Sequence, residues 1–278
     1  MDISQFLAQY GVFILAMCGA GVMGGLIAGL LGVGGGIVIV PVLYFVLGAF
    51  DVPEDVKMKI AVATSLATIV VTSLSSARSH SSRGAVDYQL LREWVAPVIV
   101  GVIAGTLLAS IAKGWVLTLV FASVAMLVAV NMMLRGKGSQ IWPDFPNRAI
   151  KSGLGSIVGL FSAMMGIGGG TLSVPILTAF GTEIRRAVGT ASAIGFFIAI
   201  PGTIGYVLTG WGTAGLPPGS LGYVNVLAFI ALVPLTALFA PLGARLAHTI
   251  PQRALGYAFG VFLIATSLKM FSDLLFLL

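Results

Sequence analysis

Long apolar runs separated by short polar connectors make up most of the chain. The first run, residues 8–50, carries no charged side chain, and as a single helix it would be about 65 Å long at about 1.5 Å per residue. The hydrocarbon core of a bilayer is about 30 Å thick, so about 20 apolar residues are enough to cross it. The first run is therefore too long for one crossing, and we expect it to break at its glycine-rich segment, residues 32–36.

Further apolar stretches follow, and each is predicted to be helical within a membrane. They lie at about residues 60–77, 94–112, 115–134, 152–181, 187–209, 221–244 and 254–278. A basic connector that contains prolines separates the third of these stretches from the fourth. The pattern predicts an all-α, polytopic helical bundle, with a first membrane repeat (1–134), a cytoplasmic connector (135–151) and a second membrane repeat (152–278).

The two halves have related sequences. At a shift of 134 positions, Gly32 aligns with Gly166, Gly34–Gly36 align with Gly168–Gly170, and Pro41 aligns with Pro175. At a shift of 126, the Ala-Val-Ala-Thr segment that ends at Thr64 aligns with the Ala-Val-Gly-Thr segment that ends at Thr190. Because the whole spacing from GxGGG to proline recurs, the two halves are predicted to be homologous.

The distribution of Lys and Arg predicts how the halves are oriented, since cytoplasmic loops carry an excess of both. The cytoplasmic connectors are then residues 78–92, 135–151, 183–186 and 245–253, and the external ones are Asp51–Asp55, Lys113 and the uncharged turn 210–220. Corresponding connectors fall on opposite sides, as in an inverted repeat. Each half would begin with a glycine-broken helix, either a helical hairpin or two half-helices. A parallel four-plus-four arrangement is the alternative.

Composition identifies the solvent. Of the 278 residues, 58% are hydrophobic and only 9% are charged, whereas a soluble domain has about a quarter charged residues. The mean hydropathy is +1.07, so most of the surface is expected to contact the lipid bilayer. The net charge of +6 comes from residues in connectors, which fits membrane topology better than nucleic-acid binding. The first residues lack a basic region, so no cleaved signal peptide is expected.

The residues that usually hold metals or nucleotides are sparse. Cys18 is the single cysteine, and His80 and His248 lie in or beside basic connectors, so we expect no metal site. The glycine-rich segments are not dinucleotide-binding motifs, because Ile37 and Thr171 stand where GxGxxG needs glycine. No cofactor is expected. A membrane-embedded enzyme needs a nucleophile and a base together, and the sequence does not predict one.

The glycine-rich segments instead predict an anion site. Glycines leave backbone N–H groups unshielded, and a helix that restarts after a break presents unpaired N–H groups and the positive end of its dipole, which together bind anions. The candidate residues are Gly32, Gly34, Gly35, Gly36, Gly166, Gly168, Gly169 and Gly170, with Pro41 and Pro175 as helix-break or hinge positions. The alternative is that these glycines only allow close helix packing.

Side chains on the next spans extend this candidate site. Hydroxyl donors to the anion are Thr64, Ser65, Thr190 and Ser192, and the charges at the two entrances are Lys57, Lys59, Arg185 and Arg186. The alternatives are that the hydroxyls bond their own helix carbonyls and that the charges only set topology. No Asp or Glu lies deep in an apolar run, so no carboxylate proton relay is predicted. A coupled proton or another ion remains an expected partner.

These motifs resemble those of the sulfite exporter TauE/SafE family, also called the toluene sulfonate uptake permease family. The similarity rests on the segments Gly25–Gly36 and Gly159–Gly170, each followed by Val-Pro, at Pro41 and Pro175. The resemblance implies a secondary transporter of the bacterial plasma membrane for sulfite, sulfonates, sulfoacetate or related organosulfur anions. Alternating access around the glycine-rich site is the expected mechanism, and an anion channel with the same site is the alternative.

Overall fold

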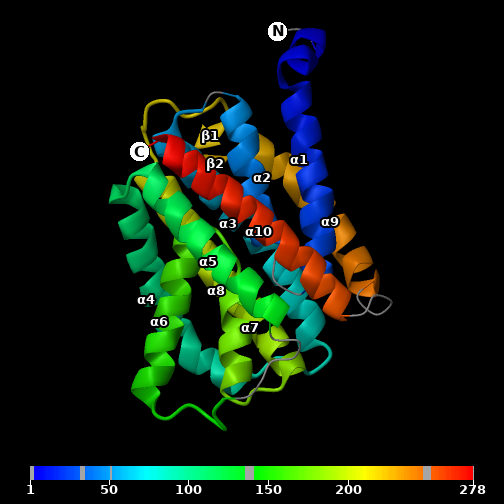
Figure 1. The fold of residues 1–278 in the computed structure, drawn as a ribbon, viewed down its shortest axis with the longest axis vertical. Helices are drawn as coiled ribbons and strands as arrows, with labels where there is room; N and C mark the ends of the chain where they lie inside the picture. Colours follow the sequence, from blue (N-terminus) through cyan, green and yellow to red (C-terminus); the bar gives the residue numbers. More distant parts are fainter. Residues whose placement is uncertain (1–2, 32–34, 51, 135–140, 247–251, 278) are drawn as a thin grey trace.

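The chain forms a bundle of helices with one small two-stranded sheet (Figure 1). The computed structural model describes residues 3–31, 35–50, 52–134, 141–246 and 252–277. The helices of the first half are α1 (Ile3–Leu31), α2 (Gly36–Ala49), α3 (Glu54–Ser81), α4 (Tyr88–Ile111) and α5 (Gly114–Leu134). Those of the second half are α6 (Arg148–Met165), α7 (Gly169–Ala179), α8 (Ile184–Thr209), α9 (Val226–Leu246) and α10 (Gln252–Leu277). The strands β1 (Ser220–Leu221) and β2 (Val224–Asn225) pair antiparallel between α8 and α9.

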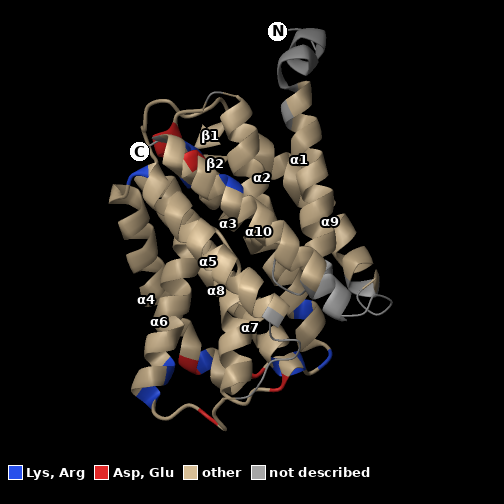
Figure 2. Cartoon of the chain, viewed as in Figure 1, with Lys and Arg blue, Asp and Glu red and all other residues tan. Residues whose placement is uncertain are grey.

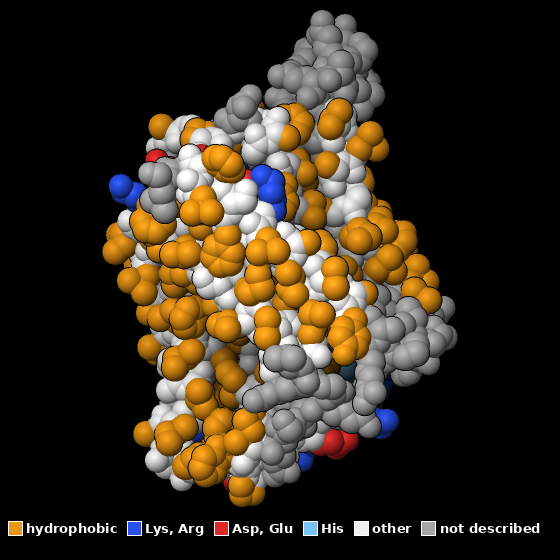
Figure 3. Space-filling model, viewed as in Figure 1, with side chains coloured by type: hydrophobic (Ala, Val, Ile, Leu, Met, Phe, Trp, Pro, Cys, Tyr) orange, Lys and Arg blue, Asp and Glu red, His pale blue; other side chains and the backbone are white. Residues whose placement is uncertain are grey.

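Helix length and surface chemistry confirm the all-α membrane fold. In the described part of the chain, six helices are long and apolar enough to cross a membrane. Hydrophobic side chains cover much of the face shown in Figure 3, and residues such as Leu15 and Leu107 are more than half exposed. Charged residues lie mainly near the two ends of the bundle (Figure 2). Such a surface suits a lipid environment, because lipid tails are as apolar as the side chains that contact them.

The predicted helix break occurs at the glycine-rich segment of both halves. In the first half α1 ends at Leu31 and α2 begins at Gly36, and in the second half α6 ends at Met165 and α7 begins at Gly169. Gly32 and Gly34 lie outside the described residues. Each half therefore begins with a glycine-broken helix pair, as the repeated motif predicts.

Each broken pair folds back on itself as a hairpin. A Cβ added to Gly24 of α1 would lie 3.0 Å from Ile39 of α2, so α2 returns along α1. In the second half, the N–H groups of Ile141 and Trp142, shortly before α6, donate to the carbonyl of Ala179 at the end of α7. The chain thus enters and leaves the second hairpin at the same end of the bundle.

Pro41 and Pro175 are not where the helices break. Both lie inside their helices, α2 and α7, after the glycine-rich segment. A proline inside a helix lacks the N–H that would bond the carbonyl four residues earlier. The two prolines therefore weaken the early turns of α2 and α7, while the breaks themselves are formed by glycine.

The two halves pack through corresponding contacts. Helix α1 packs on α9 as α4 packs on α6, and α3 packs on α8 as α5 packs on α10. Helix α3 is the centre of the bundle, because every residue from Val56 to Ile69 is buried. Since each of these pairs joins one half to the other, neither half forms a separate core.

Ion pairs show which connectors share an end of the bundle. Asp87, after α3, pairs with Arg186 at the start of α8, and Glu93 of α4 pairs with Lys151 of α6. At the opposite end, a Cβ on Gly114 would lie 2.2 Å from the carbonyl of Glu54. The predicted grouping of these connectors at two ends therefore matches the structure. Helices α3 and α8 begin at opposite ends and run antiparallel.

Candidate functional site

The two glycine-rich breaks meet in the middle of the bundle. A Cβ added to Gly36, the first residue of α2, would lie 2.6 Å from the carbonyl oxygen of Gly166 and 3.0 Å from Ser65 Oγ. Ser65 itself donates a hydrogen bond of 2.7 Å to the Gly166 carbonyl. Three of the predicted site residues, one from each of α2, α3 and the second break, are therefore in direct contact. All three residues are buried.

The start of α2 has a strained backbone that only glycine adopts readily. Gly35 has φ of 72°, in the left-handed region, and no side chain caps the helix that follows it. Its missing Cβ would lie 3.1 Å from the carbonyl of Gly24. The first N–H groups of α2 therefore lack side-chain acceptors at a buried position.

The start of α7 is also uncapped and lies against α8. Gly168 precedes the helix without a side-chain hydrogen bond to it. A Cβ on Gly169 would lie 2.7 Å from the carbonyl of Ala191 and 2.9 Å from the amide nitrogen of Gly195. Gly195 in turn faces Ser73 of α3, 3.6 Å from a Cβ built on the glycine. The close approach of α7 and α8 needs glycine on both helices.

The paired threonines form hydrogen bonds that the sequence did not predict. Thr64 Oγ1 accepts a 2.9 Å hydrogen bond from the backbone N–H of Asn225, before α9. Thr190 Oγ1 accepts one of 2.9 Å from the N–H of Asp87, before α4. Both bonds join a helix of one half to the start of a helix in the other half. The match between Thr64 and Thr190 thus has a structural explanation besides anion binding.

Asp87 and Asn225 also cap the helices that they precede. Asp87 Oδ1 accepts from the N–H groups of Gln89 and Leu90 at 3.1 and 3.0 Å, and Asn225 Oδ1 accepts from Ala228 at 2.8 Å. Asp and Asn are favoured at such positions because their side chains satisfy free N–H groups. Neither residue was predicted, although an N-cap residue before an apolar run is a signal that the sequence carries.

Lys57 and Lys59 are buried rather than open to an entrance. The Nζ atom of Lys57 pairs with Glu54 and lies 4.1 Å from the centre of the Tyr44 ring. Lys59 Nζ donates a 2.9 Å hydrogen bond to the Ser110 carbonyl at the end of α4 and lies 5.5 Å from the Tyr223 ring centre. A cation at the carboxyl end of a helix is favoured by the helix dipole. Both lysines thus have partners that position α3.

The remaining predicted side chains lie nearer the other end of the bundle. Arg185 and Arg186 are exposed, and Arg186 pairs with Asp87 at 3.0 Å. Ser192 is buried, donates to the Val188 carbonyl at 2.9 Å and accepts from Ser76 of α3 at 3.2 Å. Ser192 therefore bonds its own helix, as the alternative interpretation expected, and it also contacts α3.

Two buried hydroxyls beside the second break were missed. Ser162, in the last turn of α6, is 0% exposed, and Thr171, in the first turn of α7, is 3% exposed. Neither side-chain oxygen has a hydrogen-bond partner in the described part of the chain. Both residues lie within the repeated segment, where the first half has Ala28 and Ile37. That substitution of polar for apolar residues is the signal that could have identified them.

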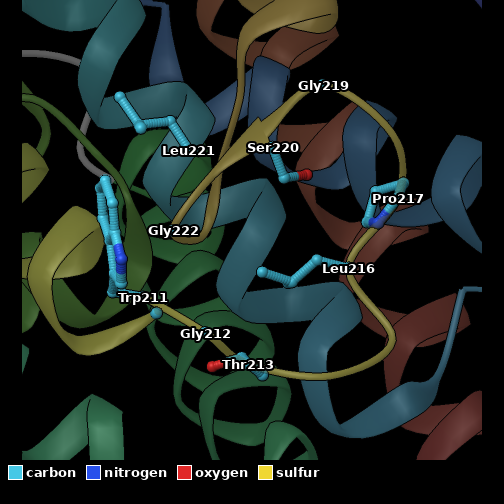
Figure 4. A pocket seen from close by; sticks show the side chains of 10 residues that line it. Trp211, Gly212, Thr213, Leu216, Pro217, Gly219, Ser220, Leu221 and Gly222 are labelled. Carbon is cyan, nitrogen blue, oxygen red and sulfur yellow. The ribbon is translucent and has the colours of Figure 1, made fainter.

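A cavity of about 340 Å³ lies away from these residues, in the loop between α8 and α9 (Figure 4). Its lining runs from Gly210 to Gly222 and contains Trp211, which is 69% exposed. A Cβ on Gly215 would lie 3.3 Å from Pro53, so the cavity belongs to the end of the bundle where α3 begins. An exposed tryptophan at this position is typical of a membrane–water interface.

The chemistry available at the meeting of the breaks is hydrogen-bond donation without charge. Residues 152–182, which include most of α6, the second break and all of α7, contain no Lys, Arg, Asp or Glu. Among the described residues no group of three or more His, Cys, Asp or Glu side chains is placed to hold a metal. Backbone N–H groups, hydroxyls and helix dipoles remain, and these are suited to an oxyanion.

Sequence comparison decides the family. The family model described as Sulfite exporter TauE/SafE matches residues 17–270, which is nearly the whole chain. The chain belongs to the sulfite exporter TauE/SafE family. This confirms the resemblance that the two glycine-rich motifs indicated.

The relatives are described as membrane transporters. A probable membrane transporter protein of Haemophilus influenzae is 35% identical over 267 residues, which cover 93% of this chain and 98% of the relative. The probable membrane transporter protein YunE of Bacillus subtilis is 27% identical over 81% of this chain and 85% of its own. One from Methanocaldococcus jannaschii is 27% identical over 76% and 78%. No solved structure matches.

The TauE/SafE protein is thus a multi-pass membrane protein of a transporter family and not an enzyme. Its function is transport across a membrane.

Proposed function

We propose that this protein is a secondary transporter that moves a small organosulfur anion, of the sulfite, sulfonate or sulfoacetate class, across the plasma membrane. The contact between Gly36, Ser65 and Gly166 carries the proposal. It joins the uncapped start of α2 to Gly166, the residue that follows α6 in the second break, and to a hydroxyl of the central helix. The N–H groups at the uncapped starts of α2 and α7 are the neutral donors near this contact, and such donors stabilise an anion without the desolvation cost of a buried cation.

The arrangement of the halves supports alternating access around this site. Helices α3 and α8 run antiparallel, and the connectors that follow them lie at opposite ends of the bundle. An inverted repeat has this property, and such repeats exchange conformations to open a central site to each side in turn. In the packed form described above, the two breaks are in contact, so one half must move for substrate to enter.

The sidedness and driving force belong to the same proposal. In this proposal the end that carries Arg78, Arg148 and Arg186 faces the cytoplasm of a bacterium, because cytoplasmic loops carry an excess of Lys and Arg. Transport is driven by the gradient of the substrate or of a coupled proton or other ion. The proposed hydroxyl ligands are Thr64 and Ser65 of α3 and Thr190 and Ser192 of α8, and Ser65 is the one in contact with both breaks.

Flux through proteoliposomes tests the function. Purified protein is reconstituted, and uptake of labelled sulfite, ethanesulfonate and sulfoacetate is measured against empty liposomes. Saturable uptake with counterflow is expected of a carrier. Large single-channel currents would instead support the anion channel, and correctly folded protein that moves none of these anions would disprove the proposal.

A further inference from the structure

Unpartnered hydroxyls are concentrated at one of the two breaks. Ser162 Oγ and Thr171 Oγ1 flank the second break, are more than nine-tenths buried, and have no hydrogen-bond partner within the described residues. Burying a hydroxyl without a partner costs free energy. A bound molecule that accepts hydrogen bonds would remove this cost.

Thr171 lies where such a molecule would meet the start of α7. Gly169, Gly170 and Thr171 are the first three residues of this 11-residue helix, and Gly168 provides no side-chain cap. The first N–H groups of a helix have no acceptor within it. The Cα–Cβ bond of a helical residue tilts toward the amino end, so the Thr171 side chain leans toward the end of α7 that carries these N–H groups.

The first break is different. At the positions that align with Ser162 and Thr171 it has Ala28 and Ile37, and Ile37 is completely buried. These side chains offer apolar contact and no hydrogen bond. The two halves are homologous, yet only the second has hydroxyl donors at these positions.

We propose that the two breaks divide the substrate between them. The second break binds the oxyanion head group through the hydroxyls of Ser162 and Thr171 and the N–H groups that begin α7. The first break contacts the apolar remainder of the substrate. This deepens the proposed function, on which it rests, and names the substrate class: a singly charged oxyanion with one head group and a small hydrocarbon tail, such as a short alkanesulfonate.

The absence of charged residues around the second break supports a single charge on the substrate. Residues 152–182 contain neither Lys nor Arg, and removing an anion from water becomes more costly as its charge increases. The carboxylate of sulfoacetate would place an uncompensated charge near Ile37, and sulfate would bring two charges to a head-group site that holds no cation.

The test measures binding and stability of the full-length protein in detergent. Ethanesulfonate is titrated against wild type, Ser162→Ala, Thr171→Val and Ser173→Ala while thermal unfolding is followed. We expect Thr171→Val and Ser162→Ala to weaken ethanesulfonate binding about fivefold each, the usual effect of one lost hydrogen bond. Without ligand, their unfolding temperatures should equal or exceed that of wild type, because an unpartnered buried hydroxyl contributes no stability.

Ser173 is the matched control. Its hydroxyl is also buried and unpartnered within the described chain, and it lies on α7 two residues after Thr171. At about 100° per residue it faces the opposite side of the helix. Ser173→Ala removes no hydrogen bond to the ligand. It should therefore bind ethanesulfonate with a dissociation constant within about twofold of wild type.

The outcomes distinguish failure of this inference from failure of the transport proposal. Wild-type binding of ethanesulfonate with unchanged binding by Thr171→Val and Ser162→Ala would overturn the inference alone. Lower stability of these two variants without ligand would also overturn it, by showing that the hydroxyls are structural. Tighter binding of sulfate or sulfoacetate than of ethanesulfonate would reject the substrate class. If no tested anion binds or is transported, both proposals fail.

Discussion

Gly169 illustrates why glycine is required at the breaks even before a ligand is considered. The positions that a Cβ would occupy on Gly36 and Gly169 lie 2.6 and 2.7 Å from the carbonyl oxygens of Gly166 and Ala191. Both distances are too short for a carbon–oxygen contact. Bulky substitutions at these glycines would therefore disturb packing as well as any access of substrate to the backbone.

We expect Gly169→Ala to lower the free energy of unfolding by about 2 kcal/mol, because overpacking forces the backbones of α7 and α8 apart. Thermal unfolding of the purified protein in detergent measures this change. Gly153→Ala is the control, since nothing lies within 4 Å of a Cβ at Gly153 of α6. A Gly169→Ala variant as stable as Gly153→Ala would show that α7 and α8 can accommodate a methyl group at Gly169.

Thr64 offers a second prediction at this scale. Its hydroxyl is completely buried and accepts the hydrogen bond from the Asn225 N–H. Thr64→Val keeps the shape but leaves that N–H without a partner, which costs about 1–3 kcal/mol. Thr64→Ser retains the acceptor and should be closer to wild type in unfolding temperature. Equal stability of Thr64→Val and wild type would mean that the Asn225 N–H finds another acceptor.

Among the elements, α4 is preceded by a residue, Asp87, that makes two separate kinds of interaction. Asp87 accepts hydrogen bonds from the N–H groups of Gln89 and Leu90, and it pairs with Arg186, whose side chain is 54% exposed. Capping is a local interaction, whereas the ion pair joins the two halves. An exposed ion pair contributes less than about 1 kcal/mol, so the cap should dominate.

We therefore expect Asp87→Ala to reduce the free energy of unfolding by about 1 kcal/mol through loss of the cap. Asp87→Asn keeps a capping oxygen, and Arg186→Gln removes only the ion pair, so both should have smaller effects. Thermal unfolding at low and high salt distinguishes the two contributions, because salt weakens only the ion pair appreciably. If Arg186→Gln destabilised the protein as much as Asp87→Ala, the ranking would be wrong.

For the whole molecule, the opposite directions of α3 and α8 matter most. The connector after α3 reaches Arg186, whereas the connector after α8 reaches Pro53 before α3. In a parallel repeat these two connectors would lie on the same side of the membrane. In an inverted repeat they lie on opposite sides.

Cysteine labelling distinguishes these arrangements. After Cys18→Ala removes the single native cysteine, Ser82→Cys and Ala214→Cys are introduced at exposed connector positions. A membrane-impermeant thiol reagent should label Ala214→Cys in intact cells and Ser82→Cys only in inverted vesicles. Ser152→Cys, at an exposed position near the start of α6, should behave as Ser82→Cys does. Labelling of Ser82→Cys and Ala214→Cys from the same side would support the parallel alternative.

Local features of this protein could be predicted from its sequence, whereas most long-range contacts could not. The spans, the break at Gly166–Gly168 and the grouping of Arg78, Arg148 and Arg186 at one end were predictable. These depend on the thickness of the bilayer, on the backbone freedom of glycine and on loop charge, which are properties of short segments. The position of the break was predicted correctly, whereas Pro41 and Pro175, expected as helix-break or hinge positions, lie within α2 and α7.

The sequence alone determined that this is a membrane protein with two related, glycine-broken halves, because each hairpin carries its own signal. The tertiary structure decided what those breaks touch. It placed Gly36 and Ser65 against Gly166 and gave Thr64 the distant Asn225 as its partner. It also buried Lys59 against the end of α4. Such contacts depend on which helices pack together, and hydrophobic periodicity cannot distinguish one apolar neighbour from another in lipid.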